Sequence, residues 1–222
     1  MNRGVARLRL RRALATMLVA LPLVLVSCAP PAATPGVPDV GPGWQPQFAN
    51  HRQVIVARGD SPTSTVGTVT LYDRTTTGWK AAGSWRTWIG RSGWAFNPKS
   101  GSGASPIGVF SLTAAGGYAP NPGSRLPYEW SPRTYSRIIN GFRTFNRVVA
   151  VDINHVPYSS PNDARRPAGW KATYGIWLHD THNSPTNGCL ALPDTAMLRL
   201  QLWLNPAARP LIVMGPAALL AL

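Results

Sequence analysis

The sequence predicts a mostly β fold, a sandwich or barrel against which one short helix packs. Two features of the 222 residues support this expectation. Prolines (22) and glycines (21) are frequent and many stand where turns are needed, which favours short strands over a helical bundle. The apolar runs are short and rich in β-branched residues, and only one stretch has a helical period.

The expected strands are short apolar stretches bounded by turn residues. They cover residues 52–59, 66–74, 78–94, 105–113, 147–154, 174–180 and 210–215. The one expected helix covers residues 194–204, with Asp194 as its N-cap. Its apolar residues Met197, Leu200 and Leu204 would share one face and pack on the sheet.

Residues 1–27 have the pattern of a secretory signal peptide. Residues 1–12 are rich in arginine, and residues 13–27 form an apolar run that is too short for a comfortable membrane span. The run ends in LVSC, and small residues before a cysteine resemble the bacterial lipobox. This resemblance implies an exported lipoprotein, anchored through Cys28 on the outer side of the bacterial cytoplasmic membrane and facing the cell wall. The alternative is an ordinary cleaved signal with an incidental cysteine.

Residues 28–46 are expected to form a semi-extended tether, because they are rich in Pro, Ala and Gly and have no apolar period. If Cys28 carries lipid, Cys189 is the only free thiol of an exported protein. A lone thiol in an oxidising compartment is a liability unless it is buried or used.

The formal net charge of +14 suits an anionic neighbour, such as a phospholipid surface, a wall polymer or a nucleic acid. No RNA- or DNA-binding motif is present in the sequence, so we do not expect a nucleic-acid partner. The charge therefore favours the membrane surface or the cell wall as the surroundings of the protein.

The stretch HDTHNSPTNGCLALPD, residues 179–194, gathers groups that suit nucleophilic catalysis. His179 ends an expected strand and Cys189 lies just before the expected helix, so the loop between them can bring the two side chains together. A neighbouring imidazole and a helix N-terminus both lower the pKa of a thiol. Gly188 would allow a sharp turn and leave its own amide and that of Cys189 free to form an oxyanion hole.

Two other interpretations of this stretch are open. Cys189 could be a buried packing residue, as free cysteines often are. His179 and His182 have the spacing of a pair of metal ligands, but no further ligand set is evident and zinc sites need three or four. We therefore expect no metal.

The longer stretch GIWLHDTHNSPTNGCLALPD, residues 175–194, resembles the signature of the L,D-transpeptidase family, the YkuD-type catalytic domain. In that signature a strand ends in histidine, and a serine or threonine, a variable residue, glycine and cysteine follow. SPIGVF at 105–110 resembles the family's proline-x-glycine-x-phenylalanine turn, and VVAVDIN at 148–154 resembles the strand before its histidine. The resemblance implies a catalytic domain over residues 47–222 with the family's sandwich or barrel-like β fold.

The resemblance implies that Cys189 is the nucleophile and His179 the general base, and that Gly188 shapes the oxyanion hole. Thr186 stands at the position of the family's serine or threonine. The group that orients His179 would be the main-chain carbonyl of Asp180, as is typical of the family, or else the Asp180 carboxylate.

The sequence departs from the family's best-known form at two positions. Asn187 stands where a histidine usually precedes the glycine, and Ala191 stands where an arginine usually follows the cysteine. His182 could supply the missing imidazole. The residues predicted to contact substrate are Thr186, Asn187 and Asp180.

The implied activity is that of a peptidoglycan L,D-transpeptidase. Its cysteine would form a thioester with the third residue of a stem tetrapeptide, and the amine of a neighbouring stem would then form a cross-link. No cofactor is implied, and carbapenem β-lactams are implied as covalent inhibitors. The alternatives are an L,D-carboxypeptidase, in which water resolves the same thioester, and a non-catalytic cell-wall-binding lipoprotein.

Overall fold

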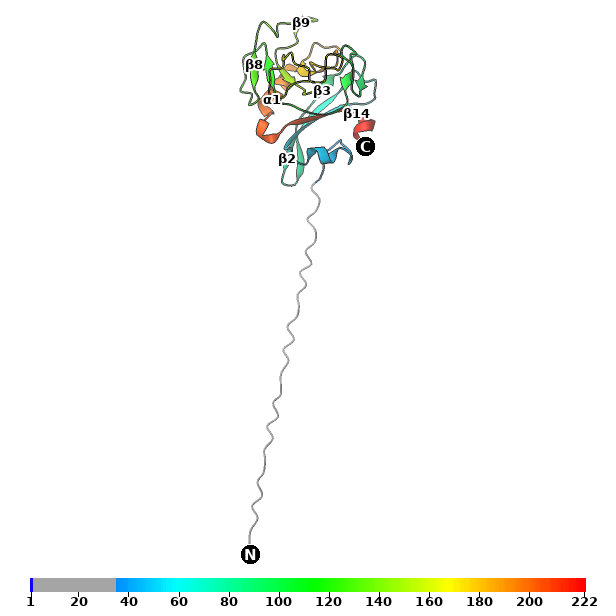
Figure 1. Ribbon diagram of the computed structural model, residues 1–222, viewed down its shortest axis with the longest axis vertical. Coiled ribbons are helices and arrows are strands. Elements are labelled where there is room, and N and C mark those ends of the chain that lie inside the picture. Colours follow the sequence, from blue (N-terminus) through cyan, green and yellow to red (C-terminus); the bar gives the residue numbers. More distant parts are fainter. Residues whose placement is uncertain (2–34) are drawn as a thin grey trace. The chain divides into compact units, whose positions relative to one another are not determined.

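The computed structural model describes Met1 and residues 35–222, and this part of the chain is mostly β (Figure 1). The elements, in chain order, are η1 (Gln45–Phe48), β1 (Gln53–Gly59), β2 (Val66–Thr75), β3 (Gly78–Trp88), β4 (Trp94–Ala95), β5 (Ser105–Pro106), β6 (Gly108–Ser111), β7 (Ala115–Gly117), β8 (Tyr128–Trp130), β9 (Ile138–Ile139), β10 (Phe142–Arg143), β11 (Val148–Ala150), β12 (Trp177–Asp180), β13 (Leu190–Leu192), α1 (Asp194–Trp203), η2 (Pro206–Ala208), β14 (Leu211–Pro216) and α2 (Ala217–Leu220). Ten strands form one sheet in the order β6-β14-β1-β2-β3-β13-β12-β11-β7-β8, and β9–β10 and β4–β5 form two small separate pairs.

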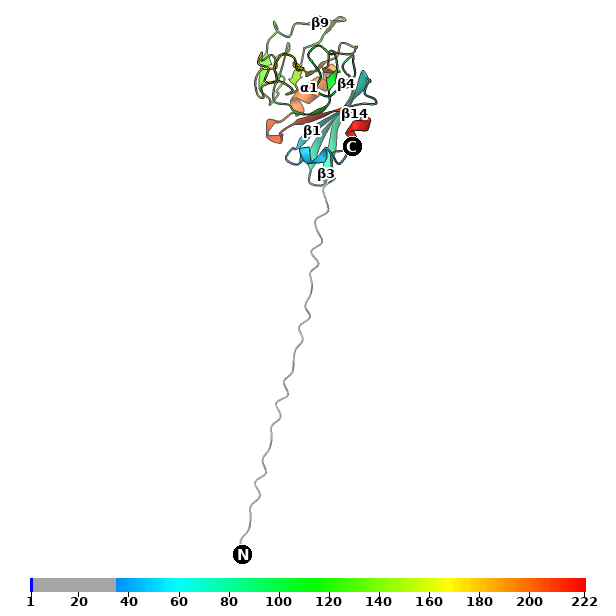
Figure 2. The same ribbon diagram turned by 45° about the vertical axis from the view of Figure 1, so that its right-hand side comes forward.

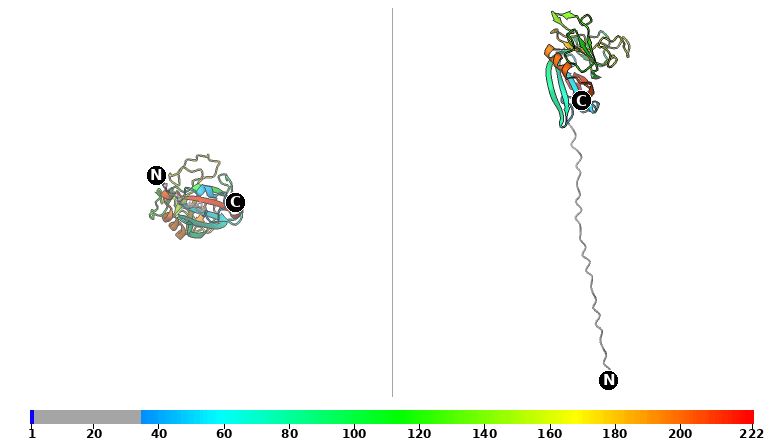
Figure 3. Two further views of the ribbon diagram at one scale, coloured as in Figure 1. Left: turned by 90° about the horizontal axis from the view of Figure 1, so that it is seen from below. Right: turned by 90° about the vertical axis from the view of Figure 1, so that its left-hand side faces the viewer.

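One half of the large sheet consists of long strands that the sequence predicted. β1, β2 and β3 pair antiparallel in succession, and β14 returns late in the chain to pair parallel with β1. The predicted strands 52–59 and 210–215 are β1 and β14. The long strands curve strongly, as Figure 3 shows, so the sheet curls into a half-barrel around its apolar face.

The other half of the sheet is made of short strands and carries the predicted site. β12 pairs antiparallel with β11 and parallel with β13. The strand predicted over 174–180 is only Trp177–Asp180, and an unpredicted strand, β13, directly follows Cys189. Helix α1 begins after β13, and its N-cap is Pro193, not Asp194. Cys189 therefore precedes a strand and not the helix, contrary to the prediction.

Helix α1 packs on the sheet through the face that its sequence predicted. Met197, Leu200 and Leu204 are fully buried, and they join the same apolar cluster as Leu178 of β12 and Leu190 of β13. This packing fixes the ends of the two strands that flank the predicted site. No helix among the described residues is long and apolar enough to cross a membrane.

The predicted tether of residues 28–46 joins the body earlier than expected. Val37 is buried, and the Gln45 side chain accepts a hydrogen bond from the Val37 N–H (2.8 Å) and donates one to the Val40 carbonyl (2.6 Å). The Gln45 side chain thus provides hydrogen-bond partners for the backbone of a proline-rich segment that belongs to no strand. The earlier part of the tether, with Cys28 and the predicted signal peptide, lies outside the described residues.

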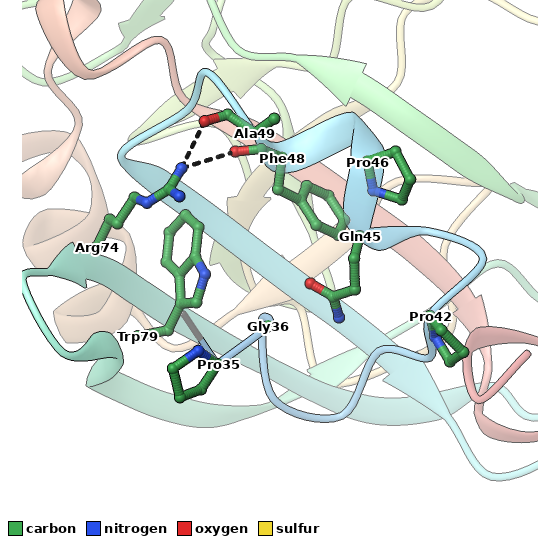
Figure 4. A pocket seen from close by; sticks show the side chains of 9 residues that line it. All are labelled: Pro35, Gly36, Pro42, Gln45, Pro46, Phe48, Ala49, Arg74 and Trp79. Carbon is green, nitrogen blue, oxygen red and sulfur yellow. Dashed lines mark hydrogen bonds between the residues drawn. The ribbon is translucent and has the colours of Figure 1, made fainter. Parts of the chain in front are cut away.

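A cavity of about 390 Å³ lies beside this segment (Figure 4). Arg74 and Trp79 line it, with the guanidinium 5.6 Å from the centre of the indole ring. The guanidinium also donates a hydrogen bond to the Ala49 carbonyl (2.5 Å). None of the predicted site residues lines this cavity, so it is separate from the candidate site.

Candidate active site

The parallel pairing of β12 with β13 places His179 and Cys189 on one face of the sheet. Leu178 pairs with Leu190, and both side chains point into the apolar core. Side chains alternate along a strand, so the residues next to these leucines point to the opposite face. His179 pairs with Ala191, two positions after Cys189, which puts the backbones of His179 and Cys189 about 8 Å apart on a diagonal. An aromatic or long side chain can reach across such a diagonal, and the His179 ring is the longer of the two side chains here.

The His179 ring is oriented by a main-chain carbonyl. Its Nδ1 lies 2.8 Å from the Asp180 carbonyl oxygen, which can only accept a hydrogen bond. Nδ1 therefore carries the proton in the neutral ring, and Nε2 is left with a lone pair that can take up a proton. Of the two orienting groups that the sequence left open, the geometry has the main chain of Asp180 in contact with the ring.

Two further rings hold the imidazole in place. Phe145 contacts the His179 ring edge-on at 5.2 Å between centres, and the His182 ring stacks on it at 5.8 Å with 18° between the planes. Burial among these groups lowers the pKa of His179 to about 4. The imidazole is therefore neutral, as a base must be, over the whole physiological range.

The Cys189 thiol lies over the start of β12. The Trp177 N–H donates to Sγ (3.4 Å), and the thiol itself donates to the Gly175 carbonyl (3.5 Å). Burial raises the pKa of Cys189 to about 11. Because β13 separates the thiol from α1, the expected lowering of its pKa by a helix N-terminus is absent. The thiol and the imidazole are therefore both uncharged at rest, and no hydrogen bond joins them in the structure.

The turn before Cys189 depends on glycine. Gly188 has φ +122°, and a Cβ at this position would lie 2.7 Å from the Ala104 carbonyl oxygen. The Ser105 hydroxyl donates to the Gly188 carbonyl (2.9 Å) and so fixes the turn from the other side. The backbone that presents the thiol therefore has little freedom to move.

Thr186 holds the same turn from within. The Gly188 N–H donates to Thr186 Oγ1 (3.1 Å), and this hydroxyl donates to the Cys189 carbonyl (2.7 Å). The prediction that the Gly188 amide is free for an oxyanion hole is therefore wrong, because the threonine hydroxyl already occupies it. Thr186 is buried and acts on the backbone, not at the surface where a substrate would bind.

Of the other two predicted substrate contacts, Asn187 is exposed at the turn and Asp180 is not. The Asp180 carboxylate accepts a hydrogen bond from the Arg147 N–H and lies 3.9 Å from the Arg147 guanidinium, which also pairs with Asp194. Burial raises the pKa of Asp180 to about 8. Its side chain points away from the His179 face, as alternation along β12 requires, so a contact with substrate there is not supported.

His182 lies beside His179 and not in a ligand cluster. Its Nδ1 lies 2.7 Å from the Ser184 hydroxyl, and its ring is stacked against that of His179. Among the described residues, no three His, Cys, Asp or Glu side chains are grouped so that they could hold a metal ion. The geometry makes His182 a neighbour that packs on the candidate base.

Sequence reasoning missed the segment that covers this face. Residues 131–146, here called the flap, contain the β9–β10 hairpin, which lies at the end of the domain opposite to the β2–β3 turn (Figures 1 and 2). The Asn140 side chain donates to the His182 carbonyl (3.1 Å) and to the Ser184 hydroxyl (3.3 Å). The available signal was the pair Asn140–Gly141 between apolar residues, a sequence typical of tight hairpins, and both residues have positive φ.

Comparison with known proteins decides the family. A family model described as the L,D-transpeptidase catalytic domain (YkuD) matches residues 52–213. The chain belongs to this family. Its described part, a curled, mostly β sheet with few helices, confirms the predicted fold class.

No curated protein matches the chain. A solved structure described as that of Bdellovibrio bacteriovorus Bd1075 is 14% identical in sequence, with a TM-score of 0.42 over 75% of this chain and 49% of that one. This chain thus spans about half of the Bd1075 chain.

Proposed function

We propose that this L,D-transpeptidase family member forms peptidoglycan cross-links through a thioester on Cys189. One observation carries the proposal. His179 and Cys189 share a face of neighbouring strands, and the His179 Nδ1–carbonyl contact leaves Nε2 as the unprotonated nitrogen of the ring. A thiol and a neutral imidazole on one face supply the nucleophile and the base that nucleophilic acyl transfer requires.

The first half-reaction consumes the donor stem. His179 Nε2 takes the proton of the Cys189 thiol while Sγ attacks the carbonyl carbon of the third residue of a stem tetrapeptide. The amide of Cys189 is the proposed donor to the oxyanion, because the Gly188 amide is engaged. The imidazolium then returns the proton to the leaving D-alanine nitrogen, the amide bond breaks, and a thioester remains.

The second half-reaction restores the enzyme. The side-chain amine of a second stem attacks the thioester carbonyl, and His179 takes a proton from that amine. The bond between the carbonyl carbon and Cys189 Sγ then breaks, and the imidazolium returns the proton to the sulfur. The base starts and ends neutral, in keeping with its low pKa. Water in place of the amine would give an L,D-carboxypeptidase by the same steps.

The raised pKa of the thiol shapes the first step. Because the thiol is protonated and the imidazole neutral at rest, proton transfer has to accompany the attack of sulfur on the carbonyl. On the acidic side of its pH profile, the rate of the reaction should then fall as His179 is protonated. This fall should occur near pH 4, the pKa of His179, and not near the usual pKa of histidine.

Export and anchoring form a separate part of the proposal. The motif LVSC supports lipidation of Cys28 and attachment to the outer side of the cytoplasmic membrane, where the substrate lies. Cys28→Ala should release the protein into the medium or leave it unprocessed. A variant that stays membrane-bound with the mass of the wild-type mature protein contradicts this part of the proposal.

The test of the catalytic proposal is incubation of the protein with a tetrapeptide muropeptide, with products identified by mass. Cross-linked dimers that have lost one D-alanine support the transpeptidase, and tripeptide monomers indicate the carboxypeptidase. Unchanged substrate indicates the non-catalytic binding protein. Cys189→Ser is the matched control, and it should give no product.

A further inference from the structure

The flap carries positive charge next to the candidate base. Its arginines are Arg133, Arg137 and Arg143, and it contains no Asp or Glu. It also exposes two large apolar side chains, Ile138 and Phe142, at 60% and 44% of their surfaces. A cationic and partly apolar surface that covers a site is suited to an anionic ligand with an apolar part.

The backbone of the flap brings Arg137 close to the two stacked imidazoles. The Thr144 N–H donates to the Arg137 carbonyl (3.1 Å), and the next residue, Phe145, packs on the His179 ring. Asn140, three residues after Arg137, donates a hydrogen bond to the main-chain carbonyl of His182. The positive charge of Arg137 acts with burial to lower the pKa of His182.

Arg137, like Arg133, has a guanidinium without a partner among the described residues, and of these two flap arginines Arg137 is the one whose backbone lies next to the imidazoles. Its side chain is exposed and makes no ion pair or hydrogen bond with any residue in the described part of the chain. Arg143, in contrast, lies 3.6 Å from the centre of the Tyr118 ring, and Arg147 pairs with Asp180 and Asp194. The Arg137 guanidinium, carried by a backbone that lies next to the imidazoles, is thus free to bind an anion from outside.

The proposed reaction supplies such an anion. The bond that breaks joins the third residue of the stem to a terminal D-alanine, whose free carboxylate is separated from the scissile carbonyl by only the amide nitrogen and one carbon. When that carbonyl lies at Cys189, the carboxylate must lie close to the thiol and imidazole. A planar guanidinium can bind a carboxylate through two parallel hydrogen bonds.

We propose that Arg137 binds the terminal carboxylate of the donor stem peptide and so makes the enzyme selective for stems that end in a free acid. This inference rests on the proposed function for the identity of the peptide.

The test compares two peptides, a stem tetrapeptide and the same peptide with a terminal amide in place of the acid. Their dissociation constants are measured with Cys189→Ala, which cannot turn over. The acid should bind roughly fivefold more tightly than the amide, the effect of an exposed ion pair, and Arg137→Gln in this background should bind both equally. Arg133→Gln is the matched control, because Arg133 lies on the same segment and is exposed, and it should keep the preference.

The outcomes separate the inference from the proposed function. Equal binding of acid and amide, or a preference that survives Arg137→Gln, overturns the inference. An equal loss of preference in Arg133→Gln also overturns it, because it would show that the general charge of the flap is responsible. A preference lost only in Arg137→Gln supports the inference even if the wild-type protein turns over neither peptide, a result that would refute the proposed function alone. Unchanged circular dichroism must accompany each variant.

Discussion

The resting state of Cys189 makes a quantitative prediction for its alkylation. Burial raises the pKa of this thiol from 9.0 to about 11. Since only the thiolate reacts and each unit of pKa is a tenfold change in its population, Cys189 at pH 7 should react with iodoacetamide about a hundredfold more slowly than an ordinary cysteine. The rate should rise about tenfold per pH unit from pH 7 to pH 10 without a plateau.

The assay follows the peptide that carries Cys189 by mass after digestion, which separates it from Cys28. His179→Gln is the informative variant, because a neutral imidazole does not stabilise the thiolate. It should change the rate at pH 7 by less than about threefold. A plateau of rapid alkylation below pH 7 that disappears in His179→Gln would refute the reasoning, because it would show a preformed thiolate–imidazolium pair.

Three further predictions concern stability. Gly188→Ala should destabilise the domain by about 2–5 kcal/mol in urea unfolding, from its positive φ and the overlap with the Ala104 carbonyl, and a loss under about 1 kcal/mol would contradict the tight geometry of this turn. Thr186→Val should lower the free energy of unfolding by about 1–3 kcal/mol, because it leaves the Gly188 N–H unpaired. Thr186→Ser keeps the hydroxyl and should lose much less, and equal losses in the two variants would assign the effect to packing. Asp180 has a folded pKa of about 8 and an unfolded value of 3.8, so the unfolded chain holds fewer protons between these values and stability should fall as pH rises from 4 to 8. Asp180→Asn should flatten this fall in melting temperature, and an unchanged slope would assign the pH dependence to other groups.

Local patterns sufficed for the long strands and for the helix. The β-branched runs at 52–59 and 210–215 need no knowledge of their partners to be seen as strands, and the spacing of Met197, Leu200 and Leu204 identifies a buried helix face. β13 was missed because it has only three residues, all buried, and so shows neither length nor alternation. Its existence depends on pairing with β12, a contact that no local pattern contains.

The sequence was enough to predict which residues make up the candidate site, but not all of the hydrogen bonds that these residues form. The motif identified His179 and Cys189, and the strand register explains how they come to share a face. The roles of Gly188 and Thr186 could not be read correctly, because the hydrogen bond between them depends on a turn fixed from a distant segment by Ser105. Whether Asp180 faces substrate depends on alternation along a strand whose start the sequence placed three residues early.

Acylation of Cys189 can be observed by intact-protein mass spectrometry after incubation with a carbapenem, whose strained carbonyl can acylate a nucleophilic thiol. We expect a single adduct that maps to the peptide carrying Cys189 and is absent in Cys189→Ser, a variant shown by circular dichroism to be folded. A folded wild-type protein that forms no adduct, or one whose adduct persists in Cys189→Ser, would contradict the assignment of Cys189 as the nucleophile.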